Sequence, residues 1–129
     1  MRGKTIGTTL VVAALLGVGS LVAPTSVMAG HAYPADVQAA RDYALKALGS
    51  TQFQCLHNIG EYESHWNPRA ENKRTHAYGI PQSLPGSKMG KGWRTDPMVQ
   101  VRWMIQYVSG GRYGSACNAW DHIRQTGWY

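Results

Sequence analysis

The stretch EYESHWNP, residues 61 to 68, places two acidic residues two positions apart among aromatic side chains. The whole chain has only seven Asp and Glu residues, so this close pair asks for a chemical explanation. In a helix, Glu61 and Glu63 point about 160° apart. Glu63 then lies one turn after Ile59, at the edge of an apolar arc, whereas Glu61 faces the polar side and is predicted to be solvated. The two acids are therefore expected to have different roles.

Glu63 is the candidate for chemistry. It is predicted to lie at the C-terminal end of its helix, where the helix dipole disfavours negative charge. Apolar surroundings and the dipole both predict a raised carboxyl pKa. A raised pKa is what a general acid requires near neutral pH. The alternative interpretation is a structural Glu that forms an ion pair with a loop arginine such as Arg69.

The elements that must position Glu63 are predicted to be helices joined by loops rich in Gly and Pro. Apolar periodicity and helix-end residues predict four helices, over residues 37–48, 51–64, 97–108 and 115–125. Gly49 should end the first helix, Ser50 should cap the second, and Thr95 or Asp96 should cap the third. Residues 66–96 are predicted to be a loop that contains a short helical turn. No useful strand-like alternation appears, so the predicted class is all-α.

The N-terminal residues have the pattern of a secretory signal peptide over residues 1–29. Two basic residues precede an uncharged run from residue 6 to residue 23, and Val27 and Ala29 are spaced like the small residues of a signal-peptidase site. Cleavage is expected after Ala29, which makes the mature protein secreted, extracellular or associated with the cell wall. The alternative is an uncleaved membrane anchor, because the run is nearly long enough to span a bilayer.

The two cysteines, Cys55 and Cys117, lie beyond the expected cleavage point, in a stretch long enough for one domain with a modest core. Export would place them in an oxidising compartment, so they are predicted to form a disulfide. Closing so long a loop stabilises a fold by about 4 kcal/mol in the chain-entropy model. A zinc site that uses His57 or His122 fits no usual ligand spacing, and no metal or other cofactor is expected.

The charge of the chain indicates which partners to expect. Two of the 13 Lys and Arg residues precede residue 30, so the rest carries 11 basic and seven acidic side chains, a net charge of +4. Such a surface favours polyanions, including the anionic polymers of bacterial walls. Nothing resembles a nucleic-acid-binding motif, so no nucleic-acid partner is expected. Membrane contact is expected only if the signal segment stays attached, and the domain is expected to be a monomer.

Two motifs, ESHWNPRAEN at 63–72 and AYGIPQ at 77–82, resemble the first two motifs of lysozyme-like lytic transglycosylases. The closest resemblance is to small secreted transglycosylase-like domains of actinobacteria, which are related to the C-terminal domain of aggregation-promoting factors. In those domains FQCLHN, ESxWNPxAxN, AYGIPQxLPGSKM, WRTxP and a closing GWY occur in this order, as they do here. The resemblance covers about residues 50–129 and implies a small lysozyme-like helical domain there. The apolar periodicity of the preceding residues predicts an N-terminal helical segment over residues 30–49.

The resemblance also implies roles for particular residues. Glu63 corresponds to the single catalytic acid of the family, and Ser64 to the hydroxyl beside it. The family segment that lines the sugar cleft corresponds here to Tyr78, Gly79, Ile80 and Gln82. Trp120, in CNAWDH, stands where many transglycosylases have the tyrosine of a third motif, and is the remaining candidate for substrate binding. This departure leaves open which group hydrogen-bonds Glu63.

The implied activity is cleavage of peptidoglycan between MurNAc and GlcNAc. A hydrolase of glycosides usually needs two carboxyl groups, whereas a lytic transglycosylase needs one, because the substrate's own 6-hydroxyl replaces water. The alternative of a two-carboxylate muramidase would take its second acid from Glu71, Asp96 or Asp121, for which solvation, helix capping and a surface position are simpler interpretations. Aromatic rings pack on sugars, and the rings expected near a cleft are those of Trp66, Tyr78 and Trp93, whereas Phe53 and Trp103 are expected in the core.

Two other classes of function stay open at this point. A wall-binding or aggregation-promoting module with little turnover would keep the same motifs. A secreted cationic toxin or inhibitor would use the basic surface without them.

Overall fold

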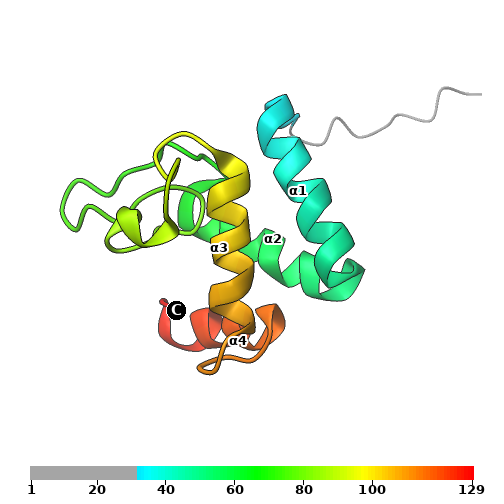
Figure 1. The fold of residues 1–129 in the computed structure, drawn as a ribbon. Helices are drawn as coiled ribbons and strands as arrows, with labels where there is room; N and C mark the ends of the chain where they lie inside the picture. Colours follow the sequence, from blue (N-terminus) through cyan, green and yellow to red (C-terminus); the bar gives the residue numbers. More distant parts are fainter. Residues whose placement is uncertain (1–31) are drawn as a thin grey trace, which may run out of the picture. The chain divides into compact units, whose positions relative to one another are not determined.

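The computed structural model describes residues 32–129, which belong to one unit of the chain. The signal peptide predicted over residues 1–29 lies outside the described residues. Within residues 32–129 the regular elements are four α-helices and one short 3-10 helix, without a β-strand (Figure 1). They are α1 (Ala35–Leu48), α2 (Ser50–Ser64), η1 (Gly86–Met89), α3 (Pro97–Ser109) and α4 (Ala116–Thr126). The all-α prediction is confirmed, and so is each of the four predicted helices.

Helix α1 buries a stripe of small and apolar residues. Val37, Ala40 and Ala44 follow one another at helical spacing and are fully enclosed, because α1 packs against α3 and α2. Gly49 ends the helix with a φ of 76°, a left-handed value that glycine adopts without strain. Gly49 also precedes the first residue of α2, so Ser50 is helical rather than the predicted N-cap. The boundary between α1 and α2 at Gly49 was correctly predicted. The prediction that Ser50 caps α2 was wrong.

Helix α2 ends in an unusual way. His65 and Trp66 both have positive φ values, 52° and 57°, which are uncommon for residues other than glycine. This turn folds the indole of Trp66 back over α2, where it lies against Gly60 so closely that a Cβ at residue 60 would be 2.5 Å from the ring. Trp66 is only 1% exposed. The prediction that Trp66 lines a cleft is therefore wrong, and its ring belongs to the core.

Arg41 of α1 is held among rings beside Trp66. Its guanidinium lies 4.0 Å from the ring centroid of Tyr33 and 4.5 Å from that of Trp66. A guanidinium can only donate hydrogen bonds, so the Nδ1 atom of His57, 2.9 Å away, accepts one and carries no proton. Burial, and after it the charge of Arg41, lowers the pKa of His57.

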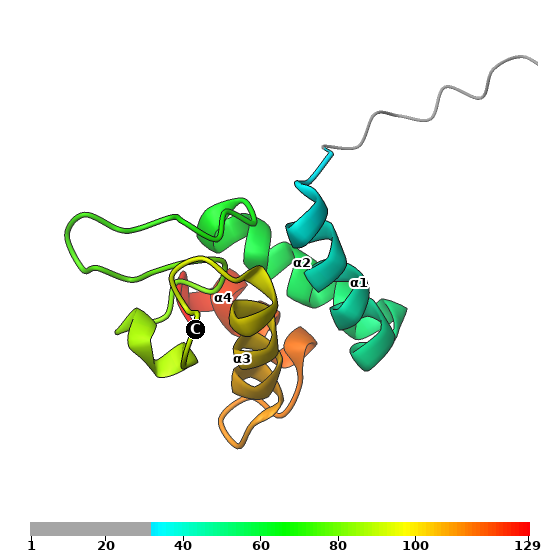
Figure 2. The same cartoon turned by 45° about the horizontal axis from the view of Figure 1, so that its top comes forward.

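The long segment between α2 and α3 is fixed by one buried side chain. Gln100 of α3 is fully enclosed, and its amide accepts a hydrogen bond from the backbone N–H of Ile80 at 2.8 Å. The same amide donates to the carbonyl oxygens of Pro68 at 2.8 Å and Trp93 at 2.7 Å. In two views α3 lies between α1 and this segment (Figures 1 and 2). Gln100 thus attaches three points of the segment to the helical core.

Gly79 allows this close attachment. A Cβ at residue 79 would lie 2.6 Å from the side-chain amide carbon of Gln100, and the φ of Gly79 is 77°. The side chain of any other residue would clash with the Gln100 amide, and its backbone would also be strained at this φ. Asp96 and Pro97 then begin α3 as predicted, since the Asp96 side chain accepts a hydrogen bond from the backbone N–H of Met98 at 2.9 Å.

Gln100→Met should destabilise the fold strongly, because it keeps the side-chain length but removes three buried hydrogen bonds. We expect the free energy of unfolding to fall by about 3 kcal/mol or more, measured by urea denaturation. Gln106→Met, at an exposed position of the same helix, is the matched control and should change it by less than about 0.5 kcal/mol. Equal midpoints for the two variants would contradict the role of Gln100.

His57→Asn tests the environment of Arg41, because the Asn oxygen can accept the same bond but does not titrate. The folded-state pKa of His57 is lowered, so its contribution is fully present above the unfolded value of about 6.5 and is lost as the pH falls. The wild type should therefore lose stability relative to His57→Asn as the pH falls from about 7.5 to about 5.5. Parallel denaturation curves at both pH values would show that His57 is not the titrating group.

Candidate functional site

Glu63 lies in the last turn of α2 and is partly buried. Burial raises the pKa of its carboxyl group from 4.5 to about 7, in the direction predicted from its sequence position. Among residues 32–129 its carboxyl group has no hydrogen-bond or ion-pair partner, so the alternative pairing with Arg69 is not formed. Glu63 is therefore a carboxyl group that can hold a proton near neutral pH.

Glu61 has different surroundings. Its carboxylate accepts a hydrogen bond from the Tyr33 hydroxyl and lies 3.6 Å from Nδ1 of His65. Glu61 is therefore not the freely solvated surface acid that the sequence predicted, because Tyr33, which precedes α1, donates a hydrogen bond to it. The two acids of EYESHWNP do differ in role, because Glu61 is engaged with neighbouring side chains and Glu63 is not.

Ser64 connects the end of α2 to the segment 77–82. Its side chain is buried, and its hydroxyl donates a hydrogen bond to the carbonyl oxygen of Ile80 at 2.9 Å. The backbone N–H of Ile80 is in turn bound by Gln100. The predicted substrate-binding residues Ser64 and Ile80 are thus brought together beside Glu63, and both have structural partners within the protein.

Tyr78 and Gln82 also use their polar groups internally. The Tyr78 hydroxyl donates to the carbonyl oxygen of Arg94 at 2.8 Å, and its ring meets that of Trp93 edge-on at 4.8 Å. The Gln82 amide donates to the carbonyl oxygens of Ala70 and Gly79, at 3.1 and 3.0 Å. In this structure these residues shape the segment 77–82, which forms one side of the site.

A cavity of about 290 Å³ lies against this segment. Its lining consists of Pro81, Gln82, Ser83, Leu84, Lys88, Trp103, Tyr107 and Tyr129. Three aromatic rings and one amine therefore line a space that lies at the lower limit of the size range of small-ligand sites. Trp103, which was expected to be core, lines this cavity instead.

Tyr129 lines the cavity and is near enough to Glu63 to feel its charge, although Glu63 itself does not line the cavity. Its hydroxyl donates a hydrogen bond to the carbonyl oxygen of Pro81 at 2.8 Å. Burial, and after it the nearby charge of Glu63, raises the pKa of Tyr129 well above 10. Sequence reasoning assigned no role to Tyr129, although the closing GWY of the resembled pattern contains it. Glu63, Tyr129 and the segment 77–82 together make the candidate site.

Trp120 lies elsewhere. Its ring meets that of Tyr62 edge-on, with centroids 6.3 Å apart, and it lines a groove with Asn58, Glu61 and His65. Glu63 does not line that groove. The structure therefore does not bring Trp120 together with the other predicted site residues.

The three acids considered as a second carboxylate all have other partners. Glu71 accepts a hydrogen bond from His76 at 2.9 Å, which lowers the pKa of its carboxyl group. Asp96 caps α3, and Asp121 forms an ion pair with Arg124 one turn later on α4. These local roles agree closely with the solvated position, the helix cap and the surface position that the sequence suggested for the three acids.

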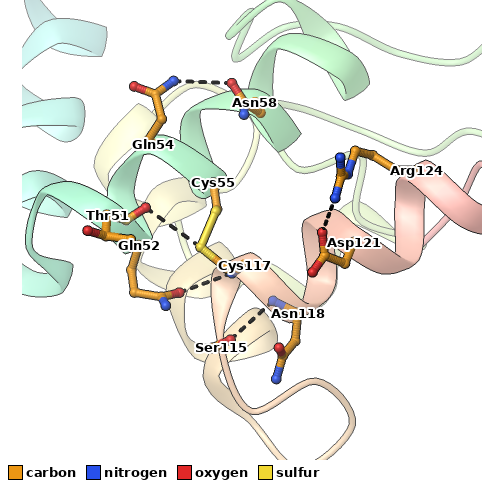
Figure 3. Close-up of a disulfide and its surroundings, with 10 residues drawn as sticks. All are labelled: Thr51, Gln52, Gln54, Cys55, Asn58, Ser115, Cys117, Asn118, Asp121 and Arg124. Atoms are coloured by element: carbon orange, nitrogen blue, oxygen red, sulfur yellow. Dashed lines mark hydrogen bonds and ion pairs between the residues drawn. A yellow bond between two sulfur atoms is a disulfide. The ribbon is translucent and has the colours of Figure 1, made fainter.

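The predicted disulfide between Cys55 and Cys117 is present and joins α2 to α4 (Figure 3). The Cα atoms of the two cysteines are 4.9 Å apart. Beside the bridge, the Gln52 amide accepts a hydrogen bond from the backbone N–H of Cys117 at 3.0 Å (Figure 3). The helix that carries Glu63 is thus covalently fixed to the last helix of the unit.

Within the described part of the chain, no three His, Cys, Asp or Glu side chains are grouped so that they could hold a metal ion. No helix among residues 32–129 is both long and apolar enough to cross a membrane. Comparisons with protein-family models, curated proteins and solved structures found no match to the chain. The functional interpretation therefore rests on the residues and geometry of the site.

A pH titration of Glu63 tests the electrostatics of this site directly. The side-chain carboxyl carbon of Glu63, followed by NMR, should titrate with a midpoint of about 7. Because the folded-state pKa is raised, the contribution of Glu63 to stability is fully present below about pH 4.5 and is lost as the pH rises through about 7. The wild type should accordingly lose stability relative to Glu63→Gln over that interval. A midpoint near 4.5 would mean that the carboxyl group is solvated.

Proposed function

We propose that this protein is a secreted enzyme that cleaves peptidoglycan glycan strands, a lytic transglycosylase of the lysozyme-like kind, with Glu63 as its single catalytic carboxyl group. The observation that carries the proposal is the state of Glu63. It is partly buried, it has no partner among residues 32–129, and its pKa is about 7. These are the properties of a general acid that works near neutral pH.

The aromatic cavity supports a saccharide substrate. Trp103, Tyr107 and Tyr129 offer rings on which sugar faces can pack, and the charge of Glu63 acts on Tyr129. Lys88 lines the same cavity, and the peptides of peptidoglycan carry carboxylates. The net charge of +4 beyond residue 29 fits an anionic wall in the same way.

The proposed reaction needs only one carboxyl group. Protonated Glu63 donates its proton to the glycosidic oxygen as the bond between that oxygen and the anomeric carbon of MurNAc breaks. The Glu63 carboxylate then removes the proton from the 6-hydroxyl of the same MurNAc, whose oxygen bonds to the anomeric carbon. The products are a 1,6-anhydromuramyl end and a free GlcNAc hydroxyl, and Glu63 is protonated again.

The engagement of the other acids favours this reaction over hydrolysis with two carboxylates. Glu71 is bound to His76, Asp96 caps a helix and Asp121 is paired with Arg124. A general base that activates water needs an available carboxylate across the scissile bond from the acid. None of these three is free for that role in the described structure.

Glu63→Gln should abolish the activity while leaving the fold intact, because the amide keeps the shape of the side chain but cannot donate the proton. We expect the rate of digestion of purified peptidoglycan to fall by about 100-fold or more. Mass spectrometry of the fragments released by the wild type should show 1,6-anhydromuramyl ends, which are lighter than hydrolysed ends by one water molecule.

Asp42→Asn is the matched control, since it removes one negative charge from an exposed position of α1. It should stay within about threefold of the wild-type rate. Reducing ends in the products, together with a large loss of rate in Glu71→Gln, would instead indicate a two-carboxylate muramidase. Unchanged digestion by Glu63→Gln would show that Glu63 is not the catalytic acid.

A further inference from the structure

A second concave surface lies where α2 and α4 run together, and it does not include Glu63. We call it the Trp120 groove, and it is lined by Asn58, Glu61, Tyr62, His65 and Trp120. It is shallow and open to solvent, so a ligand would lie across it rather than be enclosed by it. Four of its residues, Asn58, Glu61, Tyr62 and His65, lie on or just after α2. They are three, one and three positions apart, so they share one face of the helix, whereas Glu63 points to another face.

The aromatic part of the groove is exposed and yet held in place. Tyr62 is 53% exposed, although most aromatic rings of this size are largely buried. Its hydroxyl donates a hydrogen bond to the carbonyl oxygen of Gly127 at 3.1 Å, and its ring is fixed edge-on against Trp120. Because the two rings are already held in place, their side chains lose little conformational entropy when the apolar face of a ligand covers them.

The polar part of the groove consists of Asn58, Glu61 and His65, of which Glu61 is already engaged by Tyr33 and His65. The Asn58 amide accepts a hydrogen bond from Gln54 at 3.2 Å through its oxygen, which leaves its N–H groups for a ligand. The side chain of His65 is 89% exposed. Glu61 adds a carboxylate at the edge of the groove. Aromatic rings flanked by flat donors and acceptors match a sugar, which has an apolar face of C–H groups and an edge of hydroxyl groups.

The charge of the groove argues against an anionic ligand. Glu61 is the only charged group of the groove when His65 is neutral, and no Lys or Arg lines it. A phosphate-rich polymer or an anionic lipid surface would meet repulsion there, in spite of the basic character of the chain as a whole. A saccharide whose contacts are uncharged meets no such penalty.

The disulfide holds the two sides of the groove together. Asn58 follows Cys55 by three residues on α2, and Trp120 follows Cys117 by three residues on α4. Both groove residues therefore lie one helical turn beyond the bridge, as the position of Asn58 on α2 shows (Figure 3). The width of the groove is fixed before any ligand arrives.

We propose that the Trp120 groove binds a saccharide, namely an N-acetylated segment of a glycan strand, at a site separate from the cavity beside Glu63. The saccharide class follows from the groove itself, and the choice of an N-acetylated glycan rests on the proposed function. Binding here holds the protein on the polymer while Glu63 acts on another part of it, which raises the effective concentration of cleavable bonds.

The direct test is an NMR titration of the full mature protein carrying Glu63→Gln, with N,N′,N″-triacetylchitotriose as the probe. The backbone N–H signals of Tyr62 and His65, the side-chain amide of Asn58 and the indole N–H of Trp120 should shift together and saturate. Shifts confined to Glu63-side residues such as Ile80 and Tyr129, or no shifts at all, would overturn the proposal.

A pair of variants supplies a second test, in the same Glu63→Gln protein so that the polymer stays intact. Tyr62→Ala should weaken binding to sedimented, purified peptidoglycan about fivefold to tenfold, as expected for the loss of one aromatic contact surface. Tyr43→Ala is the matched control, because Tyr43 is a partly exposed ring of α1 outside the groove. Equal binding by the two variants would overturn the proposal.

The two proposals of function fail separately. If the protein with intact Glu63 does not cleave peptidoglycan but the groove signals still shift, the catalytic proposal fails and the saccharide site stands. If Glu63 proves catalytic but the groove neither shifts nor responds to Tyr62→Ala, the groove proposal alone is wrong.

Discussion

The hydrogen bonds of one buried amide, that of Gln100, hold the long segment between α2 and α3 in place beside the helix that carries Glu63. The segment between α2 and α3 has only a single 3-10 turn of its own and no strand among its described residues. Its backbone polar groups must nevertheless find partners, and Gln100 satisfies groups of Pro68, Ile80 and Trp93 from the core side. A buried amide satisfied in this way orders a loop that has almost no regular secondary structure, together with its buried side chains such as Trp66 and Ile80.

The arrangement on either side of α2 separates two kinds of surface. One side carries Glu63 with Tyr129 and an aromatic cavity, where burial favours the protonated acid. The other carries Glu61, Tyr62 and the Trp120 groove, where polar groups are exposed and Glu61 is bound to Tyr33. On our two proposals, chemistry and binding belong to different faces of a single helix, which the disulfide anchors to α4 between its first turn and these faces.

The helices were predictable because their limits are local. Gly49 and the Asp96-Pro97 pair mark ends that need no tertiary information. The left-handed turn at His65 and Trp66 was not predictable, because it depends on the fit of the indole over Gly60. The same distinction holds for the site. The partial burial of Glu63 followed from its helical arc, whereas Tyr129 reaches Pro81 across 48 positions of sequence and no local pattern reports that contact.

The parts of the candidate site appear along the chain in a particular order. Glu63 comes first, the segment 77–82 next, then Gln100, which holds that segment, and finally Cys117 and Tyr129. A growing chain therefore presents Glu63 before the later segments that pack against α2. We expect the carboxyl group of Glu63 to keep an ordinary pKa until those segments have folded, because burial is what raises it. The raised pKa is then a late product of folding, and a polypeptide shortened at its C-terminal end would keep the residue without it.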